Sequence, residues 1–236
     1  MNNPFAGPDA VPEWPKQKAW SYSAASNHAK CPRKFRYQRI DRLPEPENEA
    51  MARGALVHKA CEARIKHGVN QSLVTEPWLQ RLDELRARGA VSETQLAFNK
   101  EWNSVPWFGA AVWGRCVLDA SYKISSRIVQ IVEFKTGREY PEHAQQLRLY
   151  ALAGFILHPE AEEVRSELWY LDWYLDRNEA PRPGYVAQRV AVPRLKEEFV
   201  EFARPMLNDT LYPAKPGPGC KWCHFRRSNG GPCEQG

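Results

Sequence analysis

The spacing of apolar residues predicts helices in the first third of the chain. The expected helices cover residues 21–37, 54–67 and 75–88. Ser21 or Ser23 can serve as the N-cap of the first, and Pro77 lies in the first turn of the third. Proline-rich text before these helices predicts an extended arm.

Alternating apolar and polar positions replace the helical spacing after about residue 90 and predict strands. The expected strands cover residues 94–102, 110–124, 128–135, 167–175 and 184–192. Helical spacing returns at 142–157 and at 194–208. This order of elements predicts a mixed α/β domain around a central sheet.

The composition agrees with a folded protein. The 236 residues are 43% hydrophobic and 26% charged, near the values of ordinary globular proteins. We expect an arm at 1–18, a main domain at 19–211 and a cysteine-rich tail at 212–236. The net charge of +5 is mild and compatible with a polyanionic partner such as nucleic acid.

Nothing in the sequence predicts a membrane segment. No apolar run is long enough to span a bilayer, and the N-terminus lacks the pattern of a secretory signal. We therefore expect a cytoplasmic protein, in which the six cysteines are core residues or ligands rather than disulfides.

The most informative segment is a predicted strand pair that carries charged residues among apolar ones. Asp119 lies in the first strand, and Glu133 and Lys135 project from one face of the second. A bound cation would compensate such charges, and carboxylates are the ligands that Mg²⁺ prefers. The cation would activate water and Lys135 would assist, although an exposed hairpin with solvated charges has the same pattern.

Two further pairs of residues could complete a site. Gln146 and Tyr150 lie four apart on a predicted helix and could contact a phosphate, or be an exposed glutamine and a core tyrosine. Gly54 lies four residues before His58, whose ring could be a metal ligand or a hydrogen-bonded structural residue.

Together these motifs resemble the PD-(D/E)XK nuclease superfamily and its RecB-like branch. That branch shows G-x-x-x-H, an Asp on a strand, (D/E)-x-K-T-G and Q-x-x-x-Y, and this chain reads Gly54–His58, Asp119, Glu133–Gly137 and Gln146–Tyr150 in that order. The resemblance implies a restriction-endonuclease-like fold, with a central mixed sheet flanked by helices. It also implies metal-dependent hydrolysis of DNA, by an exonuclease rather than an endonuclease.

The resemblance also implies roles for individual residues. Mg²⁺ or Mn²⁺ would be held by His58, Asp119, Glu133 and the carbonyl oxygen of Phe134. Lys135 would assist the water, while Gln146 and Tyr150 would position DNA or the metal shell. Glu93 resembles an extra acidic position of some relatives, with a surface glutamate as the alternative.

The cysteines near the two ends of the chain form a second motif. Cys220, Cys223 and Cys233 lie in the tail, and Cys31 lies in a C-P-x-x-F segment. This set is similar to that of AddB-type and CRISPR-adaptation exonucleases, which implies a 4Fe–4S cluster that joins the N- and C-terminal ends. A zinc site is the alternative, in which His224 could replace one thiolate.

Basic residues accompany both cysteine segments and predict contact with DNA phosphates. They are Arg33, Lys34, Arg36, Arg226 and Arg227, with Phe35 and Tyr37 as candidates for stacking on single-stranded bases. A solvated basic helix face is the alternative. The expected partners are linear or single-stranded DNA ends and a helicase or recombination protein, with a phage origin among the settings that fit. The alternative function is a catalytically inactive DNA-binding or assembly subunit of a recombination or repair complex.

Overall fold

The computed structural model describes residues 13–46, 48–172 and 184–235, and it divides into two compact units. The central unit comprises residues 47–200, and the chain-end unit comprises residues 1–46 and 201–236. The domain boundary predicted from the sequence was at residue 211. The helix α6 (Val192–Asn208) contributes residues to both units, so the division falls inside an element that looks continuous in the sequence.

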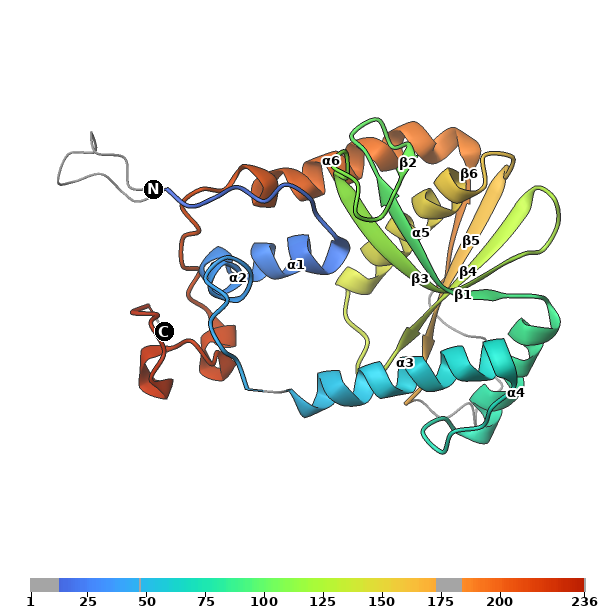
Figure 1. Cartoon of the computed structure of the whole chain (residues 1–236), viewed down its shortest axis with the longest axis horizontal. Coiled ribbons are helices and arrows are strands. Elements are labelled where there is room, and N and C mark those ends of the chain that lie inside the picture. The colour runs from blue at the N-terminus through green and yellow to red at the C-terminus, as the bar shows by residue number, and fades with distance from the viewer. Residues whose placement is uncertain (1–12, 47, 173–183, 236) are drawn as a thin grey trace. The chain divides into compact units, whose positions relative to one another are not determined.

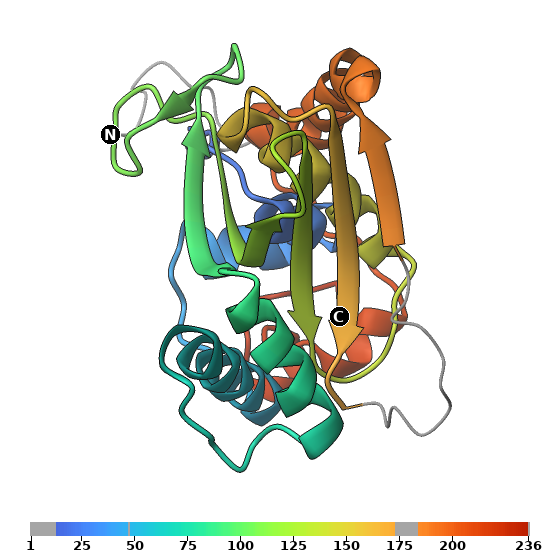
Figure 2. The ribbon, with the colours of Figure 1, turned by 90° about the vertical axis from the view of Figure 1, so that its right-hand side faces the viewer.

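The central unit is built on a six-stranded mixed sheet with the order β2-β1-β3-β4-β5-β6. The strands are β1 (Val91–Phe98), β2 (Ser104–Val105), β3 (Gly114–Lys123), β4 (Ile128–Lys135), β5 (Glu163–Tyr170) and β6 (Gly184–Gln188). Only β4 and β5 pair in parallel; the other neighbours are antiparallel. Figure 2 shows this sheet with α5 behind it and with α3 and α4 in front of its lower part.

Helices cover both faces of this sheet because the buried residues of β4 alternate. Val132 and Phe134 pack in one apolar cluster with α3 (Glu49–His67) and α4 (Glu76–Ala87). Ile131 lies against Gly154 of α5 (Glu142–Leu157), where a Cβ atom would come within 3.0 Å of it. Successive strand residues face opposite sides, so α5 covers the other face.

The boundaries of α3 and α4 follow from their capping residues. Asn48 accepts hydrogen bonds from the backbone N–H groups of Ala50 and Met51, so α3 begins at residue 49 rather than at the predicted 54. It ends at Gly68, whose φ of +70° suits glycine. The extent of α4 agrees with the prediction, with Thr75 at the N-cap.

Each of the five predicted strands is present among the six that the structure contains, with less accurate ends. β4 and α5 have the predicted bounds, whereas β1 stops at Phe98 because residues 99–101 turn back toward β2. The short β2 was not predicted, and β5 begins four residues before the predicted 167. Residues 173–175 of that prediction lie outside the described residues.

The chain-end unit contains α1 (Tyr22–Lys30), α2 (Pro32–Arg39), the end of α6 and two short 3₁₀ helices (Pro218–Trp222 and Arg227–Asn229). The predicted single helix over 21–37 was wrong: it is divided at Cys31, which has φ −161° and ψ 105°. The proline that follows disfavours the helical conformation at this residue. Figure 1 shows α1 and α2 as separate helices.

Aromatic side chains form the interior of the chain-end unit. Phe35 stacks on Tyr212, and Tyr37 lies against Phe225. Phe35 and Tyr37 are only 1% and 3% exposed, so the prediction that they stack on DNA bases was wrong. Their ring faces are taken by the packing of this unit.

Among the described residues, no helix is both long and apolar enough to cross a lipid bilayer.

Candidate active site

The candidate site lies in the central unit, where β3 and β4 separate. Their ladder ends at the pair Ala120–Val132, and the next positions along the two strands are Asp119 and Glu133. The Asp119 carboxylate connects the two strands beyond this point, because its Oδ2 accepts a hydrogen bond from the backbone N–H of Phe134 at 2.7 Å. The strand pair predicted from the sequence therefore brings the two carboxylates together.

Glu133 is a buried carboxylate that is only partly satisfied. Its Oε1 accepts from Lys135 Nζ at 2.7 Å and from Gln146 Nε2 at 2.9 Å. Its Oε2 is buried and has no hydrogen-bond partner among the described residues. Burial, and then the charge of Asp119, raises the pKa of Glu133 to about 8, despite the opposing effect of Lys135. Two ionised carboxylates cannot bond to each other, so the pair calls for a proton or a cation.

Gln146 and Tyr150 of α5 join this network. Gln146 accepts a hydrogen bond from Lys135 Nζ at 2.8 Å, and its Nε2 also lies 2.6 Å from the hydroxyl of Tyr150. Both side chains are buried, which excludes the alternative of an exposed glutamine. The carbonyl oxygen of Gln146 holds the ammonium group of Lys135 in place. Burial, and then the charge of Glu133, raises the pKa of Tyr150, so its hydroxyl stays protonated.

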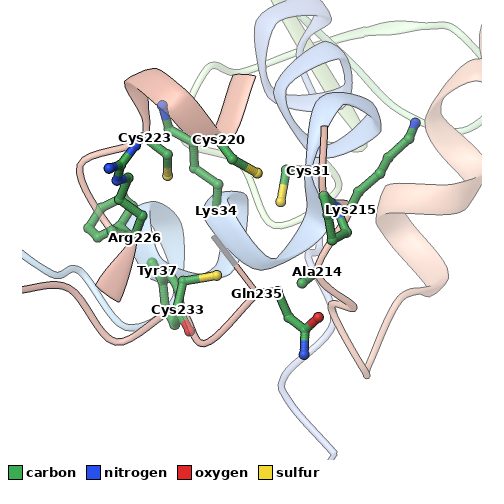
Figure 3. Close-up of a pocket in the computed structure, with 12 residues that line it drawn as sticks. Cys31, Lys34, Tyr37, Ala214, Lys215, Cys220, Cys223, Arg226, Cys233 and Gln235 are labelled. Carbon is green, nitrogen blue, oxygen red and sulfur yellow. The ribbon is translucent and has the colours of Figure 1, made fainter. Parts of the chain in front are cut away.

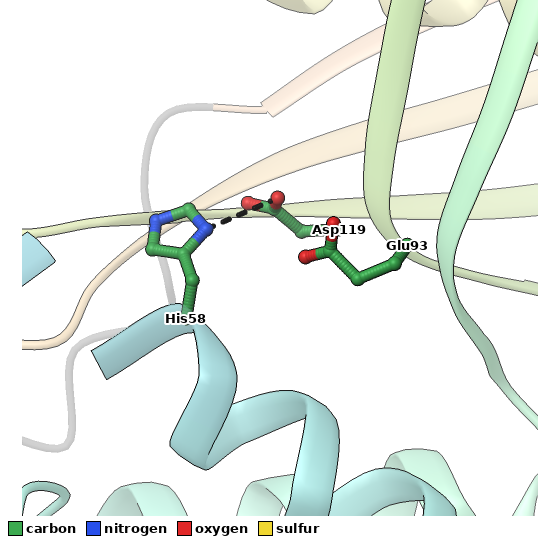
Figure 4. Close-up of side chains that lie close together, drawn as sticks. All are labelled: His58, Glu93 and Asp119. Atoms are coloured by element: carbon green, nitrogen blue, oxygen red, sulfur yellow. Dashed lines mark hydrogen bonds and ion pairs between the residues drawn. The ribbon is translucent and has the colours of Figure 1, made fainter. Parts of the chain in front are cut away.

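His58 and Glu93 approach Asp119 from its other side. One potential ligand atom from each of His58, Glu93 and Asp119 lies within 4.8 Å of the others (Figure 4). His58 Nδ1 lies 3.2 Å from Asp119 Oδ1. Burial opposes protonation of this imidazole, but the hydrogen bond and charge of Asp119 outweigh it and raise the pKa of His58.

Glu93 occupies the β1 position opposite Asp119, between the pairs Ser92–Ala120 and Thr94–Leu118. Its φ is +54°, which is uncommon for a residue other than glycine and costs on the order of 1 kcal/mol. Burial, followed by the charge of Asp119, raises the pKa of its carboxyl. Glu93, Asp119 and Glu133 therefore form one row across three neighbouring strands. The residues adjacent to Glu93 in the sequence did not indicate this placement.

This set of donors fits divalent cations. Carboxylate and imidazole groups converge on Asp119, and the unpartnered Oε2 of Glu133 is an acceptor that a cation would satisfy. Phe134, whose carbonyl was a further predicted ligand, follows Glu133 in β4, and its backbone N–H bonds to Asp119 Oδ2. Residues at these positions could hold one cation on either side of Asp119.

A polar clamp fixes α3 beside this site. Asp172, which follows β5, accepts from both terminal nitrogens of Arg53 at 2.9 and 2.5 Å and from the backbone N–H of Gly137 at 2.7 Å. A Cβ atom on Gly54 would lie 3.2 Å from Thr136 Oγ1, which explains the glycine one turn before His58. The sequence analysis missed Asp172, since a lone aspartate after a strand carries no distinguishing signal.

The chain-end unit brings together the four cysteines that the sequence analysis grouped. Cys31, Cys220, Cys223 and Cys233 line one pocket, together with Lys34, Tyr37 and Phe225. Figure 3 shows the four sulfur atoms around a shared space. Cys61 and Cys116 are buried in the central unit, where burial raises the pKa of each thiol to about 12. His224, the zinc alternative, is not among the residues that line the pocket.

The basic residues predicted to contact DNA differ in their surroundings. Arg33 donates to the carbonyl oxygen of Tyr212, and Arg36 pairs with Asp41 and lies 4.0 Å over the ring of Trp14. Lys34 Nζ lies 3.6 Å from Glu45 Oε1. Arg226 donates to the Lys221 carbonyl oxygen, and Arg227 is exposed. The first two arginines stabilise this unit, so Lys34, Arg226 and Arg227 are the better candidates for phosphate contacts.

The sequence profile of the PD-(D/E)XK nuclease superfamily matches residues 19–228. The chain belongs to the PD-(D/E)XK nuclease superfamily. The mixed sheet flanked by helices is the restriction-endonuclease-like fold expected for it. No curated protein sequence matches this nuclease.

Two solved structures are similar to this nuclease at low sequence identity. One is the crystal structure of SSO0001, with 17% identity and a TM-score of 0.43 over 94% of this chain and 88% of that one. The other is a Eubacterium rectale protein provisionally named an exonuclease, with 11% identity and a TM-score of 0.43 over 79% and 80%.

Proposed function

We propose that this nuclease hydrolyses DNA with Mg²⁺ or Mn²⁺ and acts on ends as an exonuclease. The observation that carries the metal dependence is the buried Glu133 Oε2, which lacks a hydrogen-bond partner among the described residues while its neighbour Asp119 carries the same charge. Such an arrangement is costly unless a cation joins the two groups. The RecB-like order of the motifs supports exonuclease action.

The protein residues divide the work of the reaction. A divalent cation, when bound, supplies the positive charge that activates water and stabilises negative charge on the phosphate. His58, Glu93, Asp119 and Glu133 would hold it, with the Phe134 carbonyl oxygen as a further ligand. Lys135, fixed between Glu133 and Gln146, directs its ammonium group toward the attacking water and the phosphate.

A comparison of DNA substrates tests both parts of this proposal. Linear duplex, single-stranded DNA and closed circular plasmid are incubated with Mg²⁺, Mn²⁺, Ca²⁺ or EDTA. We expect degradation of the linear and single-stranded DNA with Mg²⁺ or Mn²⁺, no degradation in EDTA, and an intact closed circle. Asp119→Asn should remove activity, whereas Asp83→Asn should not, because Asp83 lies on α4 in an ion pair with Arg64 of α3. Cleavage that persists in EDTA or in Asp119→Asn contradicts the metal mechanism, and nicking of the closed circle contradicts exonuclease action.

We also propose that the four cysteines of the chain-end unit hold a 4Fe–4S cluster. Among the described residues, no three of these sulfur atoms all lie within 4.8 Å of one another. A tetrahedral zinc ion would bring thiolate sulfurs to about 3.8 Å apart, given Zn–S bonds of about 2.3 Å. A cubane cluster separates its four thiolates more widely because each binds a different iron.

Anaerobic purification distinguishes the two metals. We expect broad visible absorption, with iron and acid-labile sulfide in the purified protein. One equivalent of zinc without iron would instead assign the cysteines to the alternative that the sequence left open.

A further inference from the structure

The positive charge of the chain is concentrated in the unit that lacks the catalytic residues. The chain-end unit has 13 basic and seven acidic residues, a net charge of +6, whereas the central unit has 20 basic and 21 acidic residues, a net charge of −1. Attraction of a polyanion therefore acts mainly on the chain-end unit. The small overall charge conceals this difference.

The chain-end unit also exposes one large aromatic side chain. Trp222, which ends the short 3₁₀ helix Pro218–Trp222 between Cys220 and Cys223, is 79% exposed. The ring carries a cation beside it, since Lys221 Nζ lies 5.1 Å from its centroid. An exposed tryptophan accompanied by lysine and arginine offers both a stacking surface and phosphate contacts.

The backbone on both sides of Trp222 is held by hydrogen bonds. The carbonyl oxygen of Lys221 accepts from Arg226 Nη1 at 3.2 Å, and that of Cys223 accepts from Asn229 Nδ2 at 3.1 Å. The Cys223 N–H bonds to the Cys220 carbonyl oxygen at 3.1 Å. The ring therefore extends from a fixed loop, which lowers the entropy lost when a ligand stacks on it.

We propose that Trp222 is a stacking platform for an unpaired base, and that Lys221 and Arg227 contact the adjoining phosphates of single-stranded DNA. This inference deepens the proposed function, on which it rests for the choice of substrate. A neutral protein partner would use the exposed ring without requiring the charge; the net charge of +6 favours a polyanion such as nucleic acid. The contact does not depend on sequence, because every base offers a ring face.

Binding measurements in Ca²⁺ test the platform on the full chain. Fluorescence anisotropy gives the Kd for a labelled 12-nucleotide single strand and for a blunt duplex of equal length. We expect Trp222→Ala to weaken single-strand binding about 5- to 100-fold, as the loss of one stacked base predicts, and duplex binding about twofold at most. Trp222→Phe should retain most of the affinity.

A matched control and a salt series separate stacking from other effects. Phe108→Ala removes a still more exposed ring, 90% exposed, from the central unit and should leave single-strand binding unchanged. Arg227→Ala should lower the slope of log Kd against log salt concentration by about one unit, whereas Trp222→Ala should not change it. The bound metal of each variant should equal that of the wild type.

The outcomes distinguish this inference from the proposed nuclease function. If Trp222→Ala binds the single strand as tightly as the wild type does, the platform is refuted, even if DNA is degraded normally. Equal loss with single-strand and duplex DNA also contradicts it. If no metal supports cleavage but Trp222→Ala still loses single-strand affinity, the nuclease proposal fails and the platform stands.

Discussion

The two units of this nuclease are stabilised in different ways. The central unit buries a sheet between helices on both faces, with Val132 and Phe134 among α3 and α4 and with α5 on the opposite side. The chain-end unit has short helices, a few stacked aromatic rings such as Phe35 on Tyr212, and four cysteines around one pocket. A small unit with little regular structure needs a further source of stability, such as a metal site.

The proposed functions are divided along the same line. The proposed metal ligands Asp119 and Glu133 need fixed positions, and the central unit provides them on neighbouring strands beside its apolar core. DNA attraction needs charge rather than a large core, and the positive charge lies in the chain-end unit. The small net charge of the whole chain therefore conceals the division between the two units that the proposed function requires.

The largest expected effect comes from removing a cluster ligand. Cys223→Ser should release the bound metal and unfold the chain-end unit, because structural metal sites contribute on the order of 10 kcal/mol to folding. The central unit should stay folded, since its core contains none of these four cysteines. Limited proteolysis with mass spectrometry should then show cleavage near residues 13–46 and 201–235 only.

Cys116→Ala, in β3 of the central unit, is the control and should retain the full metal content. If Cys223→Ser keeps its metal and its resistance to protease, the cysteines do not stabilise the chain-end unit. The two units would then not differ in their dependence on a metal site.

The second prediction concerns catalysis in the central unit. Lys135→Ala should reduce kcat about 10²- to 10⁴-fold, since the ammonium group would no longer assist the water or the phosphate. The Kd for DNA in Ca²⁺ should change about twofold at most, because DNA attraction lies mainly in the other unit. Single-turnover cleavage and anisotropy measure the two quantities.

Lys123→Ala is the matched control. Lys123 ends β3 at the far end of the same strand pair and forms an exposed ion pair with Glu160 at 2.6 Å. Its loss should leave cleavage unchanged. A Lys135→Ala protein with wild-type kcat would remove Lys135 from the mechanism.

Sequence alone predicted the parts of the site that follow from strand and helix periodicity. Glu133 and Lys135 two apart, and Gln146 and Tyr150 four apart, share faces as expected, and the structure brings all four together. The break at Cys31 had a local signal in Pro32 that periodicity outweighed. The grouping of the four cysteines came from the C-x-x-C spacing together with the family resemblance, and the structure places all four around one pocket.

Other features could not be predicted because they depend on contacts distant in sequence. The position of Glu93 follows from the register between β1 and β3, which no local pattern specifies. Asp172 acts through Arg53, 119 positions away in the sequence, and through a backbone N–H group. The burial of Tyr37 reverses what its basic neighbours suggested, since Tyr37 fills the interior against Phe225.

The third prediction separates stability from activity inside the central unit. Glu133→Gln should abolish cleavage but stabilise the metal-free protein at pH 8.5 by about 2 kcal/mol, which corresponds to a rise in Tm of about 5 °C. The amide group takes the place of the protonated carboxyl, since its nitrogen can donate to Asp119 where Glu133 Oε2 has no partner among the described residues.

The pH dependence gives the sign of this effect. The pKa of Glu133 is raised in the folded state to about 8 by burial and by Asp119, so the folded protein holds this proton more tightly than the unfolded chain does. The stabilisation by that proton is fully present below the ordinary glutamate pKa and is lost as the pH rises through about 8. The Tm difference between Glu133→Gln and wild type should therefore shrink between pH 8.5 and pH 6 in EDTA. A difference that grows as the pH falls would contradict the buried pair.

The smallest effect is expected at the clamp beside α3. Asp172→Ala removes the acceptor of Arg53 and of the Gly137 N–H, at a cost in stability of about 1 kcal/mol, as for other partly exposed ion pairs. Because the clamp holds the helix that carries His58, kcat should fall about 5- to 10-fold, and the Mg²⁺ concentration for half-maximal activity should rise by a similar factor.

Glu198→Gln is the matched control, since it breaks an ion pair of the same kind with Arg148, between α5 and α6. It should show the same loss in stability without changing the Mg²⁺ requirement. If both variants keep the wild-type Mg²⁺ dependence, the clamp stabilises the fold only, and the position of His58 depends on the apolar packing of α3 alone.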